Sequence, residues 1–163
     1  MIVRQMIASD WEQVSNIYSE GIATGFATFE TSAPGYDQWD ISHTTHSRLV
    51  VEENGTLLGW AALSPVSSRC VYGGVGEVSI YISAQSRGKG IGRLLMERLI
   101  EESEKAGFWT IQSGIFPENS DSIKLHEKMG FRYIGKRERI GKIYGVWKDN
   151  LLFERRSSTV GMD

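Results

Sequence analysis

Three glycines and three cations alternate directly before a stretch with helical periodicity, in the sequence RGKGIGR at 87–93. The glycines are Gly88, Gly90 and Gly92, and the cations are Arg87, Lys89 and Arg93. Glycine allows successive backbone N–H groups to turn inward as a nest for an anion. A helix that begins near Gly90 adds the positive end of its dipole, and the cations add side-chain charge. This pattern indicates a phosphate-binding loop.

Two common phosphate motifs do not fit the spacing in this loop. A nucleotide P-loop has Ser or Thr after its lysine, whereas Gly90 follows Lys89. The dinucleotide fingerprint G-x-G-x-x-G requires a third glycine where Arg93 stands. A glycine-rich turn that merely enters a basic helix is the simpler alternative, and the loop by itself leaves both interpretations open.

Glu77 begins a predicted strand in which apolar and polar side chains alternate over 77–83. One face carries Val78, Ile80 and Ile82, and the other carries Glu77, Ser79, Tyr81 and Ser83. A carboxylate on the polar face can accept the proton of an α-amine, whose pKa lies near ~8. By pattern alone, a solvent-exposed strand glutamate explains the residue equally well.

Three further residue types give weaker signals. Asn119 suits the N-cap of a predicted helix, and His126 borders the buried face of that helix. A histidine with a pKa near ~6.5 can donate a proton at neutral pH, although a core-edge ring with one backbone hydrogen bond is the alternative. His43 and His46 lack further ligands, so no metal site is predicted. Cys70 has no base paired with it in the sequence and is expected as an inert loop residue.

The elements that position these residues alternate in type along the chain. We expect strands at 2–6, 49–53, 56–63, 77–83, 109–115, 131–140 and 144–154, with turns at Asn54-Gly55 and at Gly141. Helices are expected after a capping box at Ser9–Glu12, after Gly90 and after Asn119, and 21–40 and 64–76 are expected as loops, the first with a short helix. This order predicts a mixed α/β sheet layered with helices, as one domain over 1–156 with a disordered polar tail at 157–163.

The bulk composition of the 163 residues narrows the class of protein. A net charge of -2 argues against a general nucleic-acid binder, and a single cysteine excludes an internal disulfide. No apolar run reaches the ~18 residues of a membrane span, and acidic Asp10 breaks the pattern of a signal peptide. We therefore expect a cytoplasmic protein with neither nucleic-acid nor membrane partners.

Two motifs taken together resemble one enzyme family. Arg87, Gly90 and Gly92 match [QR]-x-x-G-x-[GA], the acyl-coenzyme A loop of the GCN5-related N-acetyltransferases (GNAT). The segment Asn119–Phe131, NSDSIKLHEKMGF, resembles the helix that follows in this family. The resemblance implies the GNAT fold, a mixed and mostly antiparallel central sheet with a splayed pair of strands between flanking helices.

Finer matches point within the family. The segments at 28–31, 74–82, 125–127 and 141–149 are similar to the phosphinothricin and methionine sulfoximine N-acetyltransferases. These enzymes acetylate the α-amine of glutamate-like amino acids, which implies herbicide resistance for phosphinothricin. The resemblance implies acetyl-CoA as the donor, no metal, direct transfer to the amine without an acyl-enzyme, and a homodimer.

The resemblance also assigns roles to residues. Glu77 would be the general base, and His126 would protonate the leaving thiolate. The residues that would bind the cofactor are Ile80, Tyr81, Ile82, Arg87, Gly88, Lys89, Gly90, Ile91, Gly92, Arg93, Asn119 and Ser122. The residues that would bind the acceptor are Phe29, Glu30, Thr31, Arg69, Tyr72, Lys142 and Tyr144.

Two alternatives remain open at this point. The first is the same chemistry on another amine, such as a protein N-terminus, a polyamine or an aminoglycoside. The second is a non-catalytic module that binds acyl-CoA. An acidic acceptor cleft favours a polyamine or an aminoglycoside, whereas a pocket that contains Arg69 and Lys142 favours an acidic amino acid.

Overall fold

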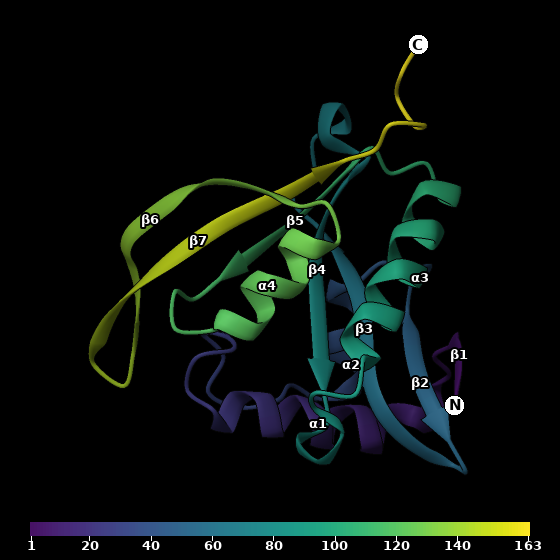
Figure 1. Cartoon of the computed structure of the whole chain (residues 1–163), viewed down its shortest axis with the longest axis vertical. Helices are drawn as coiled ribbons and strands as arrows, with labels where there is room; N and C mark the ends of the chain where they lie inside the picture. The colour runs from purple at the N-terminus through teal and green to yellow at the C-terminus, as the bar shows by residue number, and fades with distance from the viewer.

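A computed structural model describes residues 1–163 and contains one seven-stranded mixed sheet (Figure 1). The strands are β1 (Ile2–Gln5), β2 (Leu49–Glu53), β3 (Thr56–Pro65), β4 (Val75–Ile82), β5 (Thr110–Ile115), β6 (Arg132–Ile143) and β7 (Val146–Arg156). They lie in the order β1-β2-β3-β4-β5-β7-β6. Only the central pair, β4 and β5, is parallel. The predicted mixed and mostly antiparallel sheet is confirmed.

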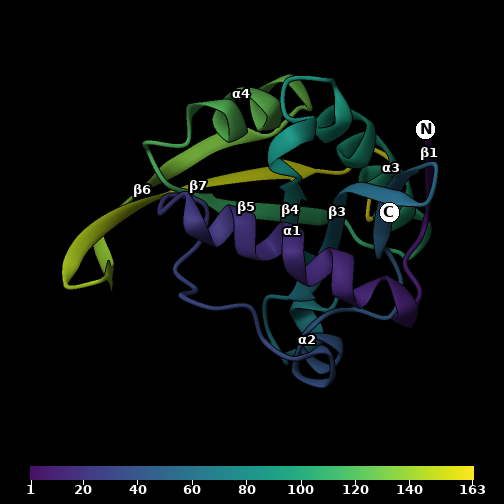
Figure 2. The ribbon, with the colours of Figure 1, turned by 90° about the horizontal axis from the view of Figure 1, so that it is seen from below.

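Helices cover both faces of this sheet (Figure 2). The helices are α1 (Trp11–Ala23), α2 (Tyr36–Ser42), α3 (Ile91–Lys105) and α4 (Ser120–Lys128). Helices α3 and α4 lie on one face, and α1 and α2 lie on the other (Figure 2). Short 3-10 turns occupy Ala8–Asp10, Cys70–Tyr72 and Ala84–Ser86. No helix in the structure has the length and apolar character needed to cross a membrane.

The alternation along β4 separates two hydrophobic cores. Val78, Ile80 and Ile82 pack on the core beneath α3, as the alternating pattern predicts. Tyr81 packs from the opposite side of the strand on the core beneath α1, next to Trp60. Neighbouring side chains of β4 therefore reach opposite faces of the sheet.

The parallel pairing between β4 and β5 is short. The three pairs are Val75 with Thr110, Gly76 with Ile111 and Glu77 with Gln112. Beyond these pairs β4 stays bonded to β3 and β5 stays bonded to β7. The two central strands therefore separate after Glu77, which gives the splayed pair that the sequence resemblance implies.

The two predicted turns have different outcomes. Asn54 and Gly55 have φ angles of 51° and 81° between β2 and β3, which confirms the type I′ hairpin. The turn predicted at Gly141 is wrong, because β6 continues to Ile143 and the chain turns at Tyr144-Gly145. A Cβ placed on Gly141 would lie 2.8 Å from the Phe29 ring, so this glycine serves a close contact inside the strand.

The capping box predicted at the start of the first helix is also wrong. A 3-10 turn precedes α1, and the Asp10 carboxylate turns back to accept the Ile7 backbone N–H at 2.8 Å. Both Asp10 oxygens also accept from the Arg4 guanidinium at 2.8 Å. The stronger charged partner holds the side chain away from the helix amides.

The C-terminal tail is folded against the body of the protein, although its polar composition predicted disorder. The Arg156 guanidinium donates to the carbonyls of Ser157, Val160 and Gly161. Thr159 donates its hydroxyl to Glu104 of α3 at 3.1 Å. These hydrogen bonds satisfy the backbone of a segment that has few apolar side chains to bury.

Candidate active site

The glycine loop leads directly into α3. Gly88 and Gly90 have φ angles of 75° and 81°, in the left-handed region that glycine adopts without strain. Gly90 is the N-cap of α3, and its carbonyl accepts the Leu94 N–H at 3.2 Å. A Cβ built on Gly88 or Gly90 would meet nothing within 4 Å, so the outer side of the loop is open.

This loop fits the diphosphate of a coenzyme. The N–H groups of the first turn of α3 have no partners within the helix, and its dipole favours an anion. Arg87, Lys89 and Arg93 are exposed beside these groups. Gly92 serves packing instead, because a Cβ there would lie 3.1 Å from Leu125 of α4. The two helices therefore meet closely beside the loop.

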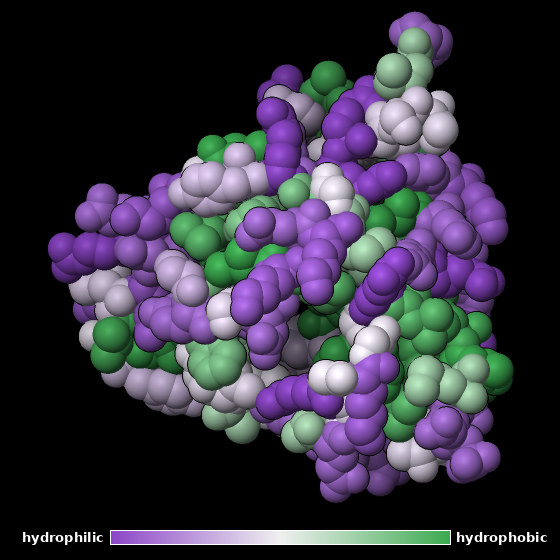
Figure 3. Space-filling model, viewed as in Figure 1, coloured by the Kyte–Doolittle hydropathy of each residue, from purple (hydrophilic) through white to green (hydrophobic).

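A cavity of about 650 Å³ begins where β4 and β5 separate. Its walls come from α1, the loop after α1, β4, β5, α4 and the hairpin of β6 and β7. On the face that carries α3 and α4, the surface is hollowed between these helices (Figure 3). The residues assigned from sequence that line the cavity are Phe29, Glu30, Glu77, Ile80, Tyr81, Asn119, Ser122, His126 and Lys142.

Glu77 lies at the fork between the separating strands. It pairs with Gln112, and its side chain lines the cavity. The residue is exposed, so its carboxylate can exchange protons with a molecule in the cavity. Because side chains alternate along β4, the Glu77 carboxylate lies on the α1 side of the sheet. The side chains of α4 lie on the opposite side.

Asn119 combines the two roles that the sequence suggested as alternatives. It is the N-cap of α4, and its side-chain oxygen accepts the Ser122 N–H at 3.3 Å. Both residues also line the cavity. The cap holds the first turn of α4 at the cavity wall, where its polar atoms are available to a bound molecule.

His126 is buried, with 1% of its surface exposed. Its Nδ1 lies 2.7 Å from the Ser122 carbonyl oxygen, and its Nε2 lies 2.8 Å from Ser113 Oγ. A carbonyl only accepts, so the Nδ1 atom carries the proton and donates it. Burial lowers the pKa of His126 below 6.5, although the hydrogen bond to Ser122 opposes this effect. The neutral ring therefore accepts the Ser113 hydroxyl proton at Nε2.

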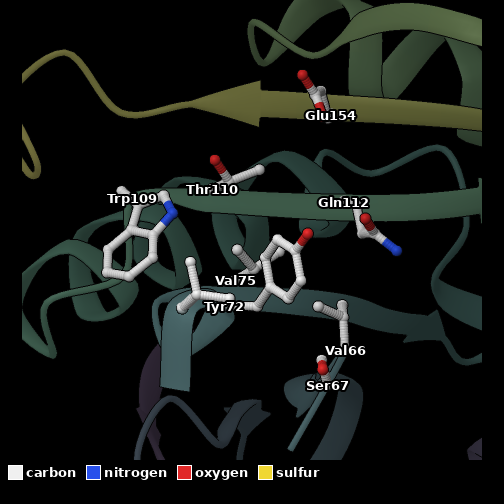
Figure 4. A pocket seen from close by; sticks show the side chains of 9 residues that line it. Val66, Ser67, Tyr72, Val75, Trp109, Thr110, Gln112 and Glu154 are labelled. Atoms are coloured by element: carbon white, nitrogen blue, oxygen red, sulfur yellow. The ribbon is translucent and has the colours of Figure 1, made fainter. Parts of the chain in front are cut away.

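Four residues expected at the acceptor lie outside this cavity. Thr31 is exposed in the loop after α1, and Tyr144 is 79% exposed in the hairpin turn. The Arg69 guanidinium lies over the Tyr72 ring at 5.7 Å. Tyr72 lines a second, open cavity of about 480 Å³ with Trp109, Gln112 and Glu154 (Figure 4).

The structure adds residues that sequence reasoning missed. Tyr18, Ser113, Arg137 and Asn150 line the first cavity. A serine between the apolar Ile111 and Ile115 on the buried face of β5 was a readable signal for Ser113. Arg137 lies on an exposed strand without any such signal.

Two tyrosines line the cavity from the α1 side. The rings of Tyr18 and Tyr81 are 4.8 Å apart, and burial is the largest cause that raises the pKa of both phenols. Both therefore stay protonated and can donate hydrogen bonds. No group of three or more His, Cys, Asp or Glu side chains is arranged to hold a metal ion.

Comparisons with known proteins agree with this geometry. Residues 11–131 match the Acetyltransferase (GNAT) family. The chain is 36% identical over 101 residues to the L-methionine sulfoximine/L-methionine sulfone acetyltransferase of Salmonella typhimurium, covering 62% of this chain and 59% of the relative. It is 29% identical over 154 residues to the L-amino acid N-acyltransferase MnaT of Escherichia coli, covering 91% and 90%.

A solved structure shows the same fold with the donor bound. The Sinorhizobium meliloti phosphinothricin acetyltransferase in complex with acetyl-CoA superposes with a TM-score of 0.85 at 28% identity. The match covers 99% of this chain and 96% of that chain. The glycine loop, the splayed strands and the match over 11–131 thus lead to one conclusion: the chain belongs to the GNAT family and is an N-acetyltransferase.

Proposed function

We propose that this enzyme transfers the acetyl group of acetyl-CoA directly to the α-amine of a small amino acid, such as methionine sulfoximine or phosphinothricin. The observation that carries the proposal is the mixed charge of the cavity. Glu30 and Glu77 line it together with Arg137 and Lys142. A zwitterion with an additional acidic group matches this pattern, because each of its charges meets an opposite charge.

The residues of the chain divide the work of acetyl transfer. Glu77 takes the proton from the acceptor ammonium, whose pKa near ~8 leaves much of it protonated at neutral pH. The free edge of β4 at Val78–Ile82 offers backbone groups to the pantetheine arm, as an added strand would find them. Acetyl-CoA supplies the activated acetyl group. The glycine loop and the N-terminus of α3 hold its diphosphate.

Polycationic acceptors fit the cavity less well. Arg137 and Lys142 would repel a polyamine or an aminoglycoside. The names of the relatives support an amino acid instead, since they include methionine sulfoximine, phosphinothricin and L-amino acids.

We also propose a homodimer. The hairpin of β6 and β7 carries four large apolar side chains that are 48% to 79% exposed in the single chain: Ile140, Tyr144, Val146 and Trp147. Such a surface is typical of an interface. Arg69, Tyr72 and Tyr144 do not line the cavity of their own chain, and a second copy would bring them to an acceptor bound in the partner's cavity. Sedimentation analysis of the wild-type protein measures its oligomeric state, and a monomer at assay concentrations would contradict the proposed dimer.

The acceptor is best identified by measuring thiol release from acetyl-CoA over a panel of amines. The panel contains methionine sulfoximine, phosphinothricin, glutamate, spermidine, an aminoglycoside and a peptide with a free N-terminus. We expect the highest kcat/KM for the first two compounds. A preference for spermidine or the peptide would contradict the proposed acceptor. Acetyl-CoA binding without turnover on any amine would instead favour a sensing module.

A further inference from the structure

Ser113 and His126 form a buried pair whose position suits proton transfer. Ser113 Oγ lies 2.8 Å from His126 Nε2, and the two side chains are 3% and 1% exposed. Both residues nevertheless line the cavity in which the transfer takes place. Ser113 follows Gln112, the partner of Glu77, so the hydroxyl lies immediately beyond the last pair between β4 and β5.

The hydrogen-bond pattern determines where the protons are. The Ser122 carbonyl fixes the ring proton on Nδ1, at 2.7 Å. The neutral ring then has only a lone pair at Nε2, and the Ser113 hydroxyl donates to it. In this form the Nε2 atom of His126 has no proton to give to a leaving thiolate, and the Nδ1 proton is held by the Ser122 carbonyl. The proton donor expected from sequence must therefore first receive a proton, and Ser113 Oγ is its only hydrogen-bonded neighbour on that side.

Glu77 and the Ser113–His126 pair lie on opposite sides of the sheet. Glu77, Ser79 and Tyr81 face α1, whereas Ser113 shares its buried face of β5 with Ile111 and Ile115, toward α4. The other titratable side chains on the cavity wall are Tyr18 from α1, Glu30 from the loop after α1, Tyr81 from β4, and Arg137 and Lys142 from β6. None of them is hydrogen-bonded to His126, whose polar partners are Ser113 and Ser122.

We propose that Ser113 Oγ and His126 Nε2 form a relay that moves one proton from the attacking nitrogen to the leaving sulfur. The proposal rests on the acetyltransferase function and deepens it. Glu77 first removes one proton from the acceptor ammonium. The nitrogen then attacks the thioester carbon, and the new C–N bond leaves it positively charged with one proton too many.

The relay first takes this proton from the nitrogen and then delivers it to the sulfur. Ser113 Oγ accepts it while the proton of Ser113 moves to His126 Nε2, and the imidazolium is held by Ser113 and the Ser122 carbonyl. The C–S bond then breaks with its electron pair on sulfur, and the sulfur accepts the proton from Ser113 Oγ. His126 Nε2 restores the hydroxyl proton, so the pair ends in its starting state. Burial lowers the pKa of His126, and the Ser122 carbonyl, which accepts the Nδ1 proton at 2.7 Å, partly offsets this effect for the charged ring.

The first test requires no turnover. Nitrogen NMR of the wild-type protein with labelled histidine reports which ring nitrogen of His126 is protonated. We expect the proton on Nδ1, and in Ser113→Ala a changed Nε2 resonance with the tautomer retained. Protonation of Nε2 in the resting enzyme would overturn the relay, because Ser113 would then have no acceptor. This result is independent of which acceptor amine the enzyme uses.

The second test counts the protons that move together in the rate-limiting step of turnover. Turnover is measured in mixtures of H₂O and D₂O with the best amine of the panel. We expect a curved dependence of kcat on deuterium fraction in the wild type and a straight line in Ser113→Ala, with kcat lower by about 10²-fold and KM for acetyl-CoA unchanged. Ser113→Thr, which keeps a hydroxyl, should recover most of the loss.

A matched control separates this role from packing. Ser103→Ala removes another buried hydroxyl, which donates to the Ile100 carbonyl on α3. Neither residue lines the cavity. This variant should match Ser113→Ala in thermal stability while keeping wild-type kcat and the curved isotope dependence. A Ser113→Ala enzyme that turns over as fast as the wild type would disprove the relay. Failure of every amine in the panel would contradict the proposed acceptor, with the NMR result deciding the relay.

Discussion

The Cα atom of Glu77 is paired with that of Gln112, and this is the last pair between β4 and β5. A carboxylate, a strand edge and a buried serine–histidine pair therefore meet within a few residues of one fork. The fork arises because β4 continues along β3 while β5 continues along β7. The backbone topology, rather than any one side chain, places these groups together.

Replacing Glu77 with Gln should lower kcat by about 10²- to 10⁴-fold, because the amide cannot accept a proton from the acceptor ammonium. Coenzyme binding should be unchanged, since the substitution leaves the backbone of β4, the glycine loop and α3 intact. Turnover and calorimetric coenzyme titration measure the two effects. Glu101→Gln, at an exposed position of α3, is the matched control. A Glu77→Gln enzyme with normal turnover would show that another group is the base.

Replacing Gly90 with Ala should raise KM for acetyl-CoA and destabilise the fold by about 1–2 kcal/mol, because its φ of 81° is unfavourable for an L-residue. Urea unfolding and kinetics report both effects. Gly35→Ala is the control, since Gly35 has a φ of -73° as the N-cap of α2 and open space around it. Equal behaviour of the two variants would argue against the assigned conformation of the loop.

Replacing Arg137 with Ala should raise KM for an acidic amino acid about tenfold, equivalent to about 1.4 kcal/mol, because one charge-assisted contact is lost. KM for acetyl-CoA should stay constant. Lys136→Ala on the same strand is a suitable control, because Lys136 does not line the cavity and lies 4.0 Å from Asp149. An identical change in both variants would indicate a general charge effect instead of a specific contact.

The stability of the fold should decrease as the pH falls below about 6.5. Burial is the largest cause that lowers the pKa of His126, His43 and His46, so the unfolded chain binds more protons than the folded one in the window between the folded pKa and 6.5. The stabilisation is complete above this window and is lost below it. Urea unfolding between about pH 7.5 and about pH 5 measures the slope. His126→Gln should reduce the slope, and an unchanged slope would show that His126 does not contribute.

Much of the fold followed from local patterns in the sequence. The alternation at Val78–Ile82 follows from the two-residue period of a strand, and the Asn54-Gly55 hairpin follows from the positive φ angles that these two residues adopt. Both signals come from residues that are close together in the sequence. The turn at Gly141 was misplaced because the reason for that glycine is Phe29, more than a hundred positions earlier in the chain. Contacts of this range leave no local signal.

The site was predictable to a similar extent. Asn119 and His126 were recognised from a motif within one helix, and the structure brings both to the cavity. The partner of His126 was missed, because Ser113 lies on a different element and the polar residue between the buried Ile111 and Ile115 marks a buried hydroxyl without naming its partner. Arg137 was missed because β6 is exposed along nearly its whole length, so its pattern does not distinguish a cavity residue from a surface cation.

The contact between Phe29 and Gly141 couples the loop after α1 to the β6–β7 hairpin, and Phe29 also packs edge-on against Phe116 with ring centroids 4.7 Å apart. Exchanging only the loop for that of a homologue would leave the side chain at position 29 poorly packed against Gly141 and Phe116. An attempt to redirect this enzyme to a new amine should therefore exchange both segments together, because their side chains pack against each other.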